Sequence, residues 1–444
     1  MIVLKFGGTS VQNAEMIDKA LDIAKSHLDR APVLVASAMA RVTDGLVEIT
    51  RAASAGNEER AREVLDQQRA HHFAVAEAFL GGSRLERGRA RLDHYFAELS
   101  SLIRGLSLLR ECTPRSTDAI LSFGELLSTT LIALRAEEQG IETELLDARD
   151  FVRTDDHFTA ASPLFEATNR LTREHVKPRA GRLIVTQGFI ARTESGATST
   201  LGRGGSDYSS TIIGAALGAE EVQIWTDVNG IMTSDPRVVG DARTIDRISY
   251  NEAAELAYFG AKVVHPSTIQ PAVETGIPVL VMNTGDPTGP GTTIVGRADG
   301  RGLRAIAGKK GITLIHVAST RMLNAYGFLS RIFATFEKHQ TPVDLIATSE
   351  VSVSMSIDNT QALAVIVREL EEIGLVGVED ELAIICLVGQ DLWKQPAFIA
   401  RVFGALKDTP VRMVSLGSSD INLSLVVPGK MLNTAIQILH REFF

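Results

Sequence analysis

The sequence predicts an α/β protein in which a mostly parallel sheet covered by helices is followed by two small ferredoxin-like modules. Residues 2–36 read as strand, helix and strand, and such a βαβ unit implies a parallel sheet with helices on its faces. The last third of the chain contains an internal repeat. Residues 285–291, rich in glycine and proline, mark a loop near a domain boundary between the two regions.

Hydrophobic periodicity defines the elements of the first region. Residues 2–4 are a short apolar run typical of a buried strand, residues 13–28 keep helical spacing, and residues 33–36 form a second run. The charged stretches 57–78 and 85–109 predict two long exposed helices without assigned chemistry. The pattern further predicts helices at 121–136, 250–259 and after Pro266, and strands at 143–147, 182–190 and 277–282.

The C-terminal repeat joins two similar helices. Phe328, Arg331 and Phe333 lie 70 positions before Phe398, Arg401 and Phe403. Each helix is followed by two strands of alternating apolar residues and by a second helix. The order βαββαβ, present twice, describes two ferredoxin-like modules. We therefore expect an α/β domain over residues 1–295 and modules over 296–380 and 381–444.

Composition narrows the classes of partner. The 444 residues carry a formal net charge of -9, so no nucleic-acid partner is expected, because such proteins show basic patches. An anionic substrate stays open, since a site can be locally positive on an acidic protein. Cys112 and Cys386 lie far apart and are interpreted as buried apolar residues, without a zinc site or a disulfide framework.

The start of the chain favours a cytoplasmic location. Met1 leads directly into a strand, with no basic segment of the kind that opens a signal peptide. No apolar run reaches the ~18 residues of a membrane span. We therefore expect a cytoplasmic protein with no membrane partner.

The stretch Lys5–Ser10 links the first strand to the first helix through paired glycines. Glycines let the backbone approach an anion, and N–H groups at a helix start point toward it. Lys5 adds a positive charge. The stretch alone is equally compatible with a tight turn beside a lysine that reaches solvent.

A second glycine-rich stretch, residues 200–207, precedes a helix of small residues at 208–217. Three glycines, an arginine and a helix start combine backbone donors, a planar fork for a carboxylate or phosphate, and a favourable dipole. Asp207 either caps this helix or orients lysine ammonium groups.

Two further segments carry polar groups. Thr226 and Asp227 follow a strand, at the edge where open α/β sheets bind ligands. Lys262 follows a Gly-Ala hinge, and His265 is interpreted as structural. The sequence has no P-loop, dinucleotide G-x-G-x-x-G or protein-kinase motif set. Two lysines, an arginine and glycine loops without a nucleophile–base pair suit phosphoryl transfer, which depends on positioning and charge neutralisation.

Taken together, five ordered motifs and the doubled tail resemble the aspartate kinase family over essentially the whole chain. The matching segments are Lys5–Ser10, Ser122–Glu125, Leu201–Asp207, Trp225–Arg237 and Lys262–Pro266. The resemblance implies a three-layer αβα amino-acid-kinase domain and two regulatory ACT modules. It also implies that ATP, with Mg²⁺, phosphorylates L-aspartate to 4-phospho-L-aspartate, the first step of lysine, threonine and methionine biosynthesis.

The resemblance further implies roles for single residues. The catalytic group would be Lys5, Asp207 and Lys262, with Asp207 orienting the two lysines that neutralise the phosphoryl group. Aspartate would be held by Thr43, Glu125 at its amino group and Arg203 at its α-carboxylate. ATP would be bound by Lys5, Gly7, Gly8, Thr226, Asp227, Met232, Arg237, Lys262 and Val263. No side chain is assigned as a metal ligand.

The tail is similar to that of the lysine-sensitive monofunctional subclass. The expected lysine site comprises Met322, Ala325, Phe328, Leu329, Val343, Asp344, Ser349 and Glu350. Ala325 stands where the subclass usually has a serine and removes a hydroxyl that could contact lysine. Met232 stands where a tyrosine often lies near the nucleotide base, which alters stacking. Feedback inhibition by lysine and a homodimer or tetramer through the ACT modules are expected.

Two other functions stay open. Another amino-acid kinase, of glutamate or uridylate type, would share the phosphoryl-transfer motifs but not the doubled tail. A catalytically silent amino-acid sensor would need only the ACT pair, and Lys5, Asp207 and Lys262 argue against it.

Overall fold

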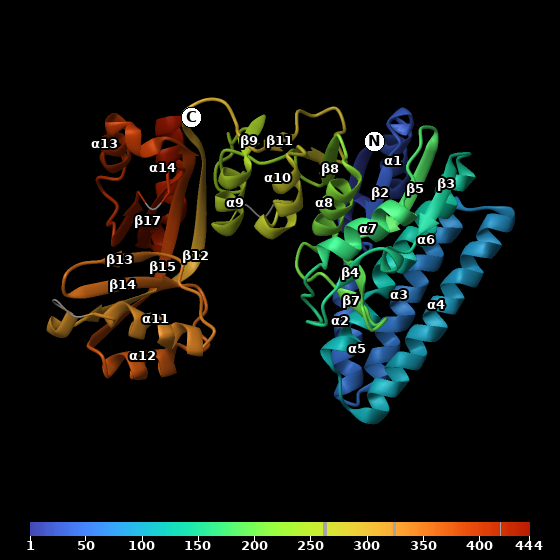
Figure 1. Cartoon of the computed structure of the whole chain (residues 1–444), viewed down its shortest axis with the longest axis horizontal. Coiled ribbons are helices and arrows are strands. Elements are labelled where there is room, and N and C mark those ends of the chain that lie inside the picture. The colour runs from blue at the N-terminus through green and yellow to red at the C-terminus, as the bar shows by residue number, and fades with distance from the viewer. Residues whose placement is uncertain (261–263, 323–325, 418) are drawn as a thin grey trace. The chain divides into compact units, whose positions relative to one another are not determined.

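The computed structural model describes residues 1–260, 264–322, 326–417 and 419–444, which form two compact units (Figure 1). The first unit comprises Met1–Ile231, Asp246–Tyr250 and the described part of Val263–Ala298. The second comprises Met232–Ile245, the described part of Asn251–Lys262, and Asp299–Phe444. The division does not follow a single cut near residue 295, because two segments before residue 263 group with the C-terminal modules.

A mostly parallel sheet forms the centre of the first unit. Strand β1 lies between β2 and β8 and is parallel to both, and all of its residues are buried. The βαβ unit predicted for residues 2–36 is thereby confirmed. Within the described residues the sheet has eight strands, in the order β3 (Glu142–Leu146), β5 (Arg182–Gln187), β2 (Val33–Ala36), β1 (Ile2–Phe6), β8 (Glu221–Thr226), β10 (Val279–Asn283), β11 (Thr292–Val295) and β9 (Arg247–Ser249).

The strand predicted at 182–190 is interrupted. Strand β5 ends at Gln187, because Phe189 adopts a left-handed conformation with φ of 65°. The chain then enters a small three-stranded sheet made of β4 (Arg153–Thr154), β6 (Ile190–Thr193) and β7 (Thr198–Thr200). The single strand of the prediction is therefore wrong in its last residues.

The described helices of the first unit lie around this sheet, some against its strands and others against those helices, as Figure 1 shows. They are α1 (Ala14–Lys25), α2 (Val42–Ser54), α3 (Glu58–Phe79), α4 (Gly82–Leu109), α5 (Pro114–Leu121), α6 (Phe123–Glu138), α7 (Phe165–His175), α8 (Gly205–Leu217) and α10 (Gln270–Thr275). The two long charged helices are present as α3 and α4, and each buries an apolar stripe, with Leu92, Phe96 and Leu99 on α4. The predicted helix over 121–136 corresponds to α6, most of which is buried in the core.

Helices α5 and α6 together form a long apolar stretch. Within the described residues, Pro114–Glu138 is the stretch long and apolar enough to cross a membrane, and 89% of its apolar window is buried. It comprises α5 and α6, which supply core residues such as Leu127 and Leu131. Core packing accounts for its hydropathy.

The second unit contains one antiparallel sheet with the helices of the repeat. Its described strands, in spatial order, are β13 (Ile346–Thr348), β14 (Ser352–Ile357), β12 (Gly302–Ala318), β15 (Leu375–Gln390), β17 (Asn422–Pro428) and β16 (Met413–Leu416). The helices are α9 (Tyr250–Tyr258), α11 (Phe328–Lys338), α12 (Leu363–Glu371), α13 (Pro396–Ala405) and α14 (Leu432–Phe443). Each copy has the predicted order of helix, two strands and helix.

The two modules share their central strands. β12 and β15 pair along their whole lengths, from Gly302 opposite Gln390 to Ala318 opposite Leu375. Ile306, on the first half of β12, packs in the core of the second copy. The second half of β12 packs against α11 and β14 of the first copy. The sheet is therefore continuous, and the second copy uses a strand that precedes the first in sequence.

The two cysteines are free and differ in burial. Cys386 is buried on β15, where burial raises the pKa of its thiol, whereas Cys112 is half-buried. The interpretation of both as buried residues is therefore wrong for Cys112. Its sulfur contacts the Thr117 hydroxyl at 3.2 Å near the start of α5.

Candidate active site

A cavity of about 530 Å³ opens in the first unit, where β1, β2, α2, α6 and α8 converge. Six residues named from the sequence line it, and they come from four separate segments of the chain. These residues are Lys5, Gly8, Thr43, Glu125, Arg203 and Asp207. The structure thus brings all three residues predicted for aspartate together with two of the three predicted to be catalytic.

Lys5 and Asp207 form an ion pair on the cavity wall. The Lys5 Nζ lies 2.6 Å from the Asp207 carboxylate, and the two side chains are 10% and 13% exposed. Lys5 projects from the central strand β1, and Asp207 lies in the first turn of α8, where the helix dipole favours a negative charge. The N-cap of α8 is Gly204, so Asp207 does not cap the helix and instead pairs with Lys5.

Close packing explains the glycines around this pair. A Cβ at Gly8 would lie 2.9 Å from the Ala38 carbonyl oxygen, a distance at which the loop could not approach β2. Gly202 and Gly204 have φ of 70° and 73°, a conformation that residues with a side chain adopt at a cost. The Gly204 position is also closed by Thr268, whose methyl would lie 2.8 Å from an added Cβ.

Glu125 is a buried carboxylate at the start of α6 and is 3% exposed. Its Oε1 accepts a hydrogen bond from the Ala38 amide at 3.0 Å, and its Oε2 has no partner among the described residues. Burial raises the pKa of Glu125 to about 8, a rise that the Ala38 hydrogen bond opposes. An oxygen without a partner on a cavity wall is suited to accept a hydrogen bond from a ligand cation.

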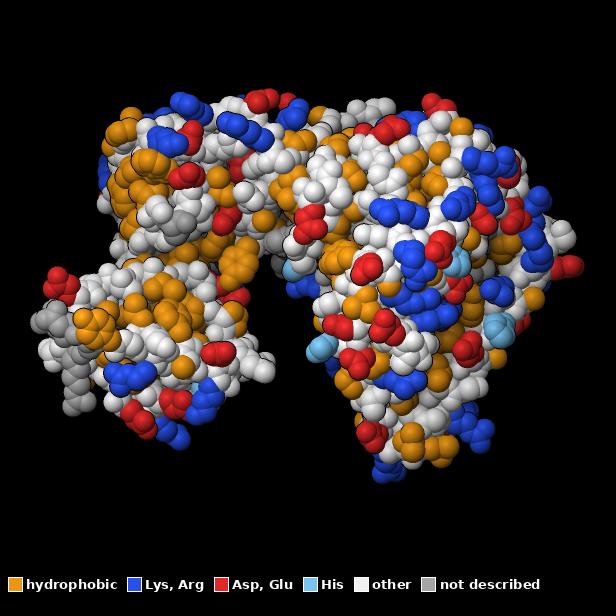
Figure 2. Space-filling view, in the orientation of Figure 1, with side chains coloured by type: hydrophobic (Ala, Val, Ile, Leu, Met, Phe, Trp, Pro, Cys, Tyr) orange, Lys and Arg blue, Asp and Glu red, His pale blue; other side chains and the backbone are white. Residues whose placement is uncertain are grey.

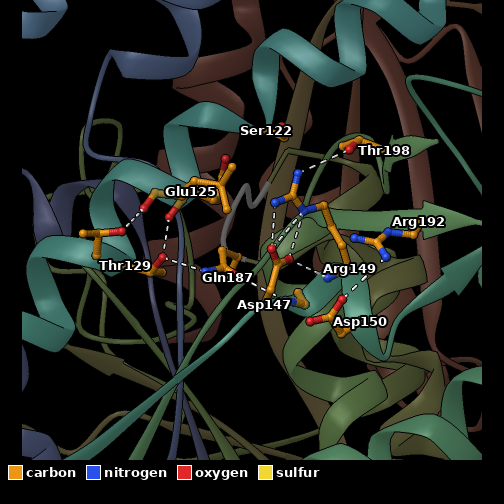
Figure 3. A network of polar contacts seen from close by, with 12 residues as sticks. Ser122, Glu125, Thr129, Asp147, Arg149, Asp150, Gln187, Arg192 and Thr198 are labelled. Atoms are coloured by element: carbon orange, nitrogen blue, oxygen red, sulfur yellow. Dashed lines mark hydrogen bonds and ion pairs between the residues drawn. The ribbon is translucent and has the colours of Figure 1, made fainter. Parts of the chain in front are cut away.

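A polar network behind Glu125 fixes the position of α6 (Figure 3). The Thr129 hydroxyl donates to the Glu125 carbonyl at 2.7 Å and accepts from the Gln187 amide at 2.8 Å. Gln187 in turn accepts from the Ala148 amide at 2.9 Å. The neighbouring Arg149 forms a bidentate pair with Asp147. Burial lowers the pKa of Arg149, but the pair with Asp147 outweighs it and the pKa is raised. The helix start is therefore tied to β5 and to the turn after β3.

Several other cavity residues escaped sequence analysis. Arg41, Thr159 and Phe189 line the cavity with φ of 67°, 73° and 65°. Such left-handed residues with side chains are uncommon and concentrate at functional sites. The sequence carries no signal for them, because glycine, asparagine or aspartate would be expected at such positions.

The residues predicted for ATP fall into separate groups. Gly7 donates its amide to the Trp225 carbonyl at 3.0 Å, which attaches the glycine turn to the end of β8 beside Thr226 and the exposed Asp227. Met232 and Arg237 belong to the second unit, where Arg237 pairs with Asp235 at 2.7 Å. Lys262 and Val263 lie outside the described residues.

Ser10, the last residue of the motif predicted at Lys5–Ser10, and Thr284, which sequence analysis missed, reinforce the attachment of the glycine turn. Their hydroxyls lie 2.7 Å apart, and the Ser10 hydroxyl also donates to the Trp225 carbonyl at 3.3 Å. Thr284 donates its amide to the Thr226 carbonyl at 2.9 Å. The three contacts hold the glycine turn and two strand ends in one arrangement.

The residues predicted to bind lysine lie around the first module. The Asp344 side chain is fully buried, 3.2 Å from the Lys309 Nζ, and its Oδ2 has no hydrogen-bond partner among the described residues. Phe328 is in the module core, whereas Leu329 is 39% exposed. The others are the half-buried Met322 and Val343 and the exposed Ser349 and Glu350, while Ala325 lies outside the described residues.

Comparisons with known proteins agree with this architecture. Residues 1–283 match the model of the amino acid kinase family, and residues 385–443 match an ACT domain. The lysine-sensitive aspartokinase 3 of Escherichia coli is 38% identical over 100% of this chain and 99% of its own length. A chloroplastic aspartokinase 1 of Arabidopsis thaliana is 36% identical over 100% of this chain and 80% of its own.

Solved structures show the same likeness. A crystal structure of E. coli aspartokinase III in complex with aspartate and ADP, in the R-state, has a TM-score of 0.87 and 37% identity. Its T-state complex with lysine and aspartate has a TM-score of 0.82 and 36% identity. Each covers 100% of this chain and 99% of its own. With the whole chain matched in sequence and fold, the protein belongs to the aspartokinases of the amino acid kinase family.

Proposed function

We propose that this chain phosphorylates the side-chain carboxylate of L-aspartate with ATP. The observation that carries this proposal is the single cavity that joins the Lys5–Asp207 pair to Thr43, Glu125 and Arg203. In the reaction, a side-chain oxygen of aspartate attacks the γ-phosphorus, the bond to the β,γ-bridging oxygen breaks, and ADP leaves with 4-phospho-L-aspartate as the product. Every step needs charge neutralisation and alignment.

Different cavity residues bind different groups of aspartate. The partner-free oxygen of Glu125 accepts a hydrogen bond from the α-ammonium, and Arg203, which is exposed on the loop before α8, pairs with the α-carboxylate. Thr43, in the first turn of α2, adds a hydroxyl. The side-chain carboxylate then lies toward Lys5, which neutralises charge on the transferring group while Asp207 holds its position.

ATP occupies the side of the cavity formed by the glycine turn. Gly7 and Gly8 let the phosphates approach the backbone, Thr226 and Asp227 lie at the next strand end, and Lys262 adds a second positive charge. Val263, and Met232 and Arg237 of the second unit, stay predictions from the sequence for nucleotide binding. Mg²⁺ accompanies the phosphates, because this ion is commonly held by substrate phosphates, water and one or two carboxylates. Within the described part of the chain no three Asp, Glu, His or Cys side chains cluster as a metal site.

A substrate panel tests the proposal. The full chain is assayed for ADP formation with ATP, Mg²⁺ and either L-aspartate, L-glutamate or uridine monophosphate. We expect turnover with aspartate alone, and hydroxamate trapping should identify the acyl phosphate. Turnover with glutamate or the nucleotide would establish a different amino acid kinase, and no turnover with any acceptor would establish a silent sensor.

We further propose that lysine inhibits the enzyme through the ACT modules. The Asp344 oxygen without a hydrogen-bond partner can accept from an incoming ammonium group while Lys309 keeps the other oxygen. We expect millimolar lysine to lower turnover and raise the melting temperature, and D344N to abolish both effects. D358N is the matched control, because it removes the second partner of Lys309 and leaves Asp344 in place. A wild-type protein that shows neither effect would contradict this proposal.

The ACT modules are also the proposed site of homodimer or tetramer formation. Figure 2 shows apolar side chains gathered on the visible face of the second unit. Ile346 and Val414, on the outermost strands β13 and β16, are 43% and 40% exposed, and exposed apolar edges of this kind favour self-association. Light scattering of the full chain is expected to give at least a dimer, and I346K is expected to weaken it. A cytoplasmic location is part of the same proposal.

A further inference from the structure

Asp118, on α5, is a fully buried carboxylate to which no role has been assigned so far. It is 0% exposed, and no cationic side chain within the described residues forms an ion pair with it. Three donors satisfy it instead: the Thr159 and Thr200 amides at 2.9 Å each, and the Thr200 hydroxyl at 2.8 Å. Burial raises the pKa of Asp118 and the three hydrogen bonds oppose the rise.

Both partners of Asp118 are walls of the cavity. Thr159 has a left-handed backbone with φ of 73° and lines the cavity, as does Thr200 at the end of β7. The Thr200 carbonyl also accepts from the Ala161 amide at 2.9 Å. One buried carboxylate therefore joins a strained turn to a strand end about forty residues away in sequence. A buried carboxylate and a strained backbone both cost stability unless the hydrogen bonds between them are formed.

The strand end that Asp118 holds leads directly into the loop with the binding groups. Leu201 follows Thr200, and Arg203 and Asp207 come next. A Cβ at Gly202 would lie 3.1 Å from the Thr159 carbonyl oxygen and 3.2 Å from the Cα of Ala160. The loop therefore rests on the same turn that Asp118 holds, and any shift of that turn shifts the base from which Arg203 extends.

We propose that Asp118 is a positioning residue for aspartate: its three hydrogen bonds align the turn at Thr159 with the glycine-rich loop so that Arg203 meets the α-carboxylate. This inference rests on the proposed function. The hydrogen bonds, rather than the charge of Asp118, provide this alignment, since no cation among the described residues pairs with the carboxylate. Asparagine can reproduce them, because its carbonyl oxygen can accept from the two amides while its NH₂ group donates to the Thr200 hydroxyl.

The test compares D118A with D118N in the full chain. We expect D118A to raise the KM for aspartate by about tenfold or more, since small misplacements of a binding group are costly, with the KM for ATP nearly unchanged. We expect D118N to stay close to the wild type. T200V removes only the hydrogen bond from the Thr200 hydroxyl, so its KM for aspartate should lie between those of D118A and D118N. It replaces D118A in the test if D118A does not fold.

A matched control separates positioning from stability. Thr168 on α7 is fully buried, exchanges two hydrogen bonds of 3.0 Å with the Arg153 backbone and does not line the cavity. T168V should lower the melting temperature while both KM values stay unchanged.

Three outcomes would overturn the inference: equal rises of both KM values in D118A and T200V, a D118N variant as impaired as D118A, or unchanged aspartate KM in D118A and T200V. If calorimetry detects no aspartate binding to the wild type, the proposed function fails as well. A wild type that turns over aspartate while D118A and T200V keep its KM refutes the positioning role alone.

Discussion

Both units hold a lysine paired with an aspartate, and the two pairs have different surroundings. Lys5 contacts Asp207 at 2.6 Å on the wall of a cavity, beside a glycine turn and a helix start. Lys309 lies between Asp344 at 3.2 Å and Asp358 at 2.8 Å, with its Nζ 4.4 Å from the centre of the Tyr258 ring. The Tyr258 hydroxyl also bonds to Asp344, and burial, followed by this bond, raises its pKa.

The difference shows how the same type of pair, a lysine with an aspartate, can serve ligand binding in one place and folding in another. An ammonium group has three donors. Among the described residues Lys5 has one carboxylate partner, and an open cavity lies beside it, so donors remain for a ligand. Lys309 has two carboxylates and an aromatic face, so its charge is already neutralised within the protein. We therefore expect removal of Lys5 to affect turnover and removal of Lys309 to affect folding.

The largest expected effect is that of K5A on turnover. Loss of the charge that stabilises the transferring phosphoryl group should lower kcat by about 10³-fold, with a much smaller change in the KM for aspartate. Steady-state kinetics and a thermal melt are the measurements. A K5A variant that keeps wild-type turnover would remove Lys5 from the catalytic group.

The next effect is the loss of stability in K309M. Methionine keeps the apolar stem but leaves the buried Asp344 without its cation, and breaking a buried pair in this way should lower the free energy of unfolding by about 3 kcal/mol. Turnover without lysine should stay close to wild type. A urea titration measures the free energy of unfolding, and the kinase assay measures turnover. If K309M instead resembles K5A, the contrast between the two pairs is lost.

The smallest expected effect concerns pH and Glu125, whose pKa burial raises to about 8. Below that pH the free enzyme holds a neutral carboxyl, whereas an ammonium ligand requires the charged form. The KM for aspartate should therefore fall about tenfold per pH unit as the pH rises toward 8 and then level off. E125Q should remove this dependence. A flat wild-type profile would show that the Glu125 proton is not linked to binding.

The raised pKa of Glu125 also makes the stability of the folded protein depend on pH. Because the pKa of Glu125 in the folded state lies above its ordinary value of 4.5, ionisation of Glu125 disfavours the folded state. Its contribution to stability is greatest below pH 4.5 and declines as the pH rises toward 8. Saturating aspartate should offset this loss, which a melting-temperature series with and without aspartate measures.

Much of the fold could be predicted because it depends on local patterns. Apolar runs and helical spacing located β1, α1 and β2, and the 70-residue offset located both copies of the C-terminal repeat. Glycine-rich motifs likewise selected Lys5, Arg203 and Asp207, and the family resemblance added Glu125; the four line one cavity. The break after Gln187 escaped, because the left-handed Phe189 has no sequence signature.

The sequence by itself determined the class of elements, their order, and the residue types that phosphoryl transfer needs. Only the tertiary structure decided that β12 serves both modules, that residues 232–245 group with the second unit, and that burial raises the pKa of Glu125. The role of Asp118 also depends on it, since its partners lie 41 and 82 residues away. The physical reason is that burial and pairing are set by distant segments, whereas a sequence pattern records only neighbours.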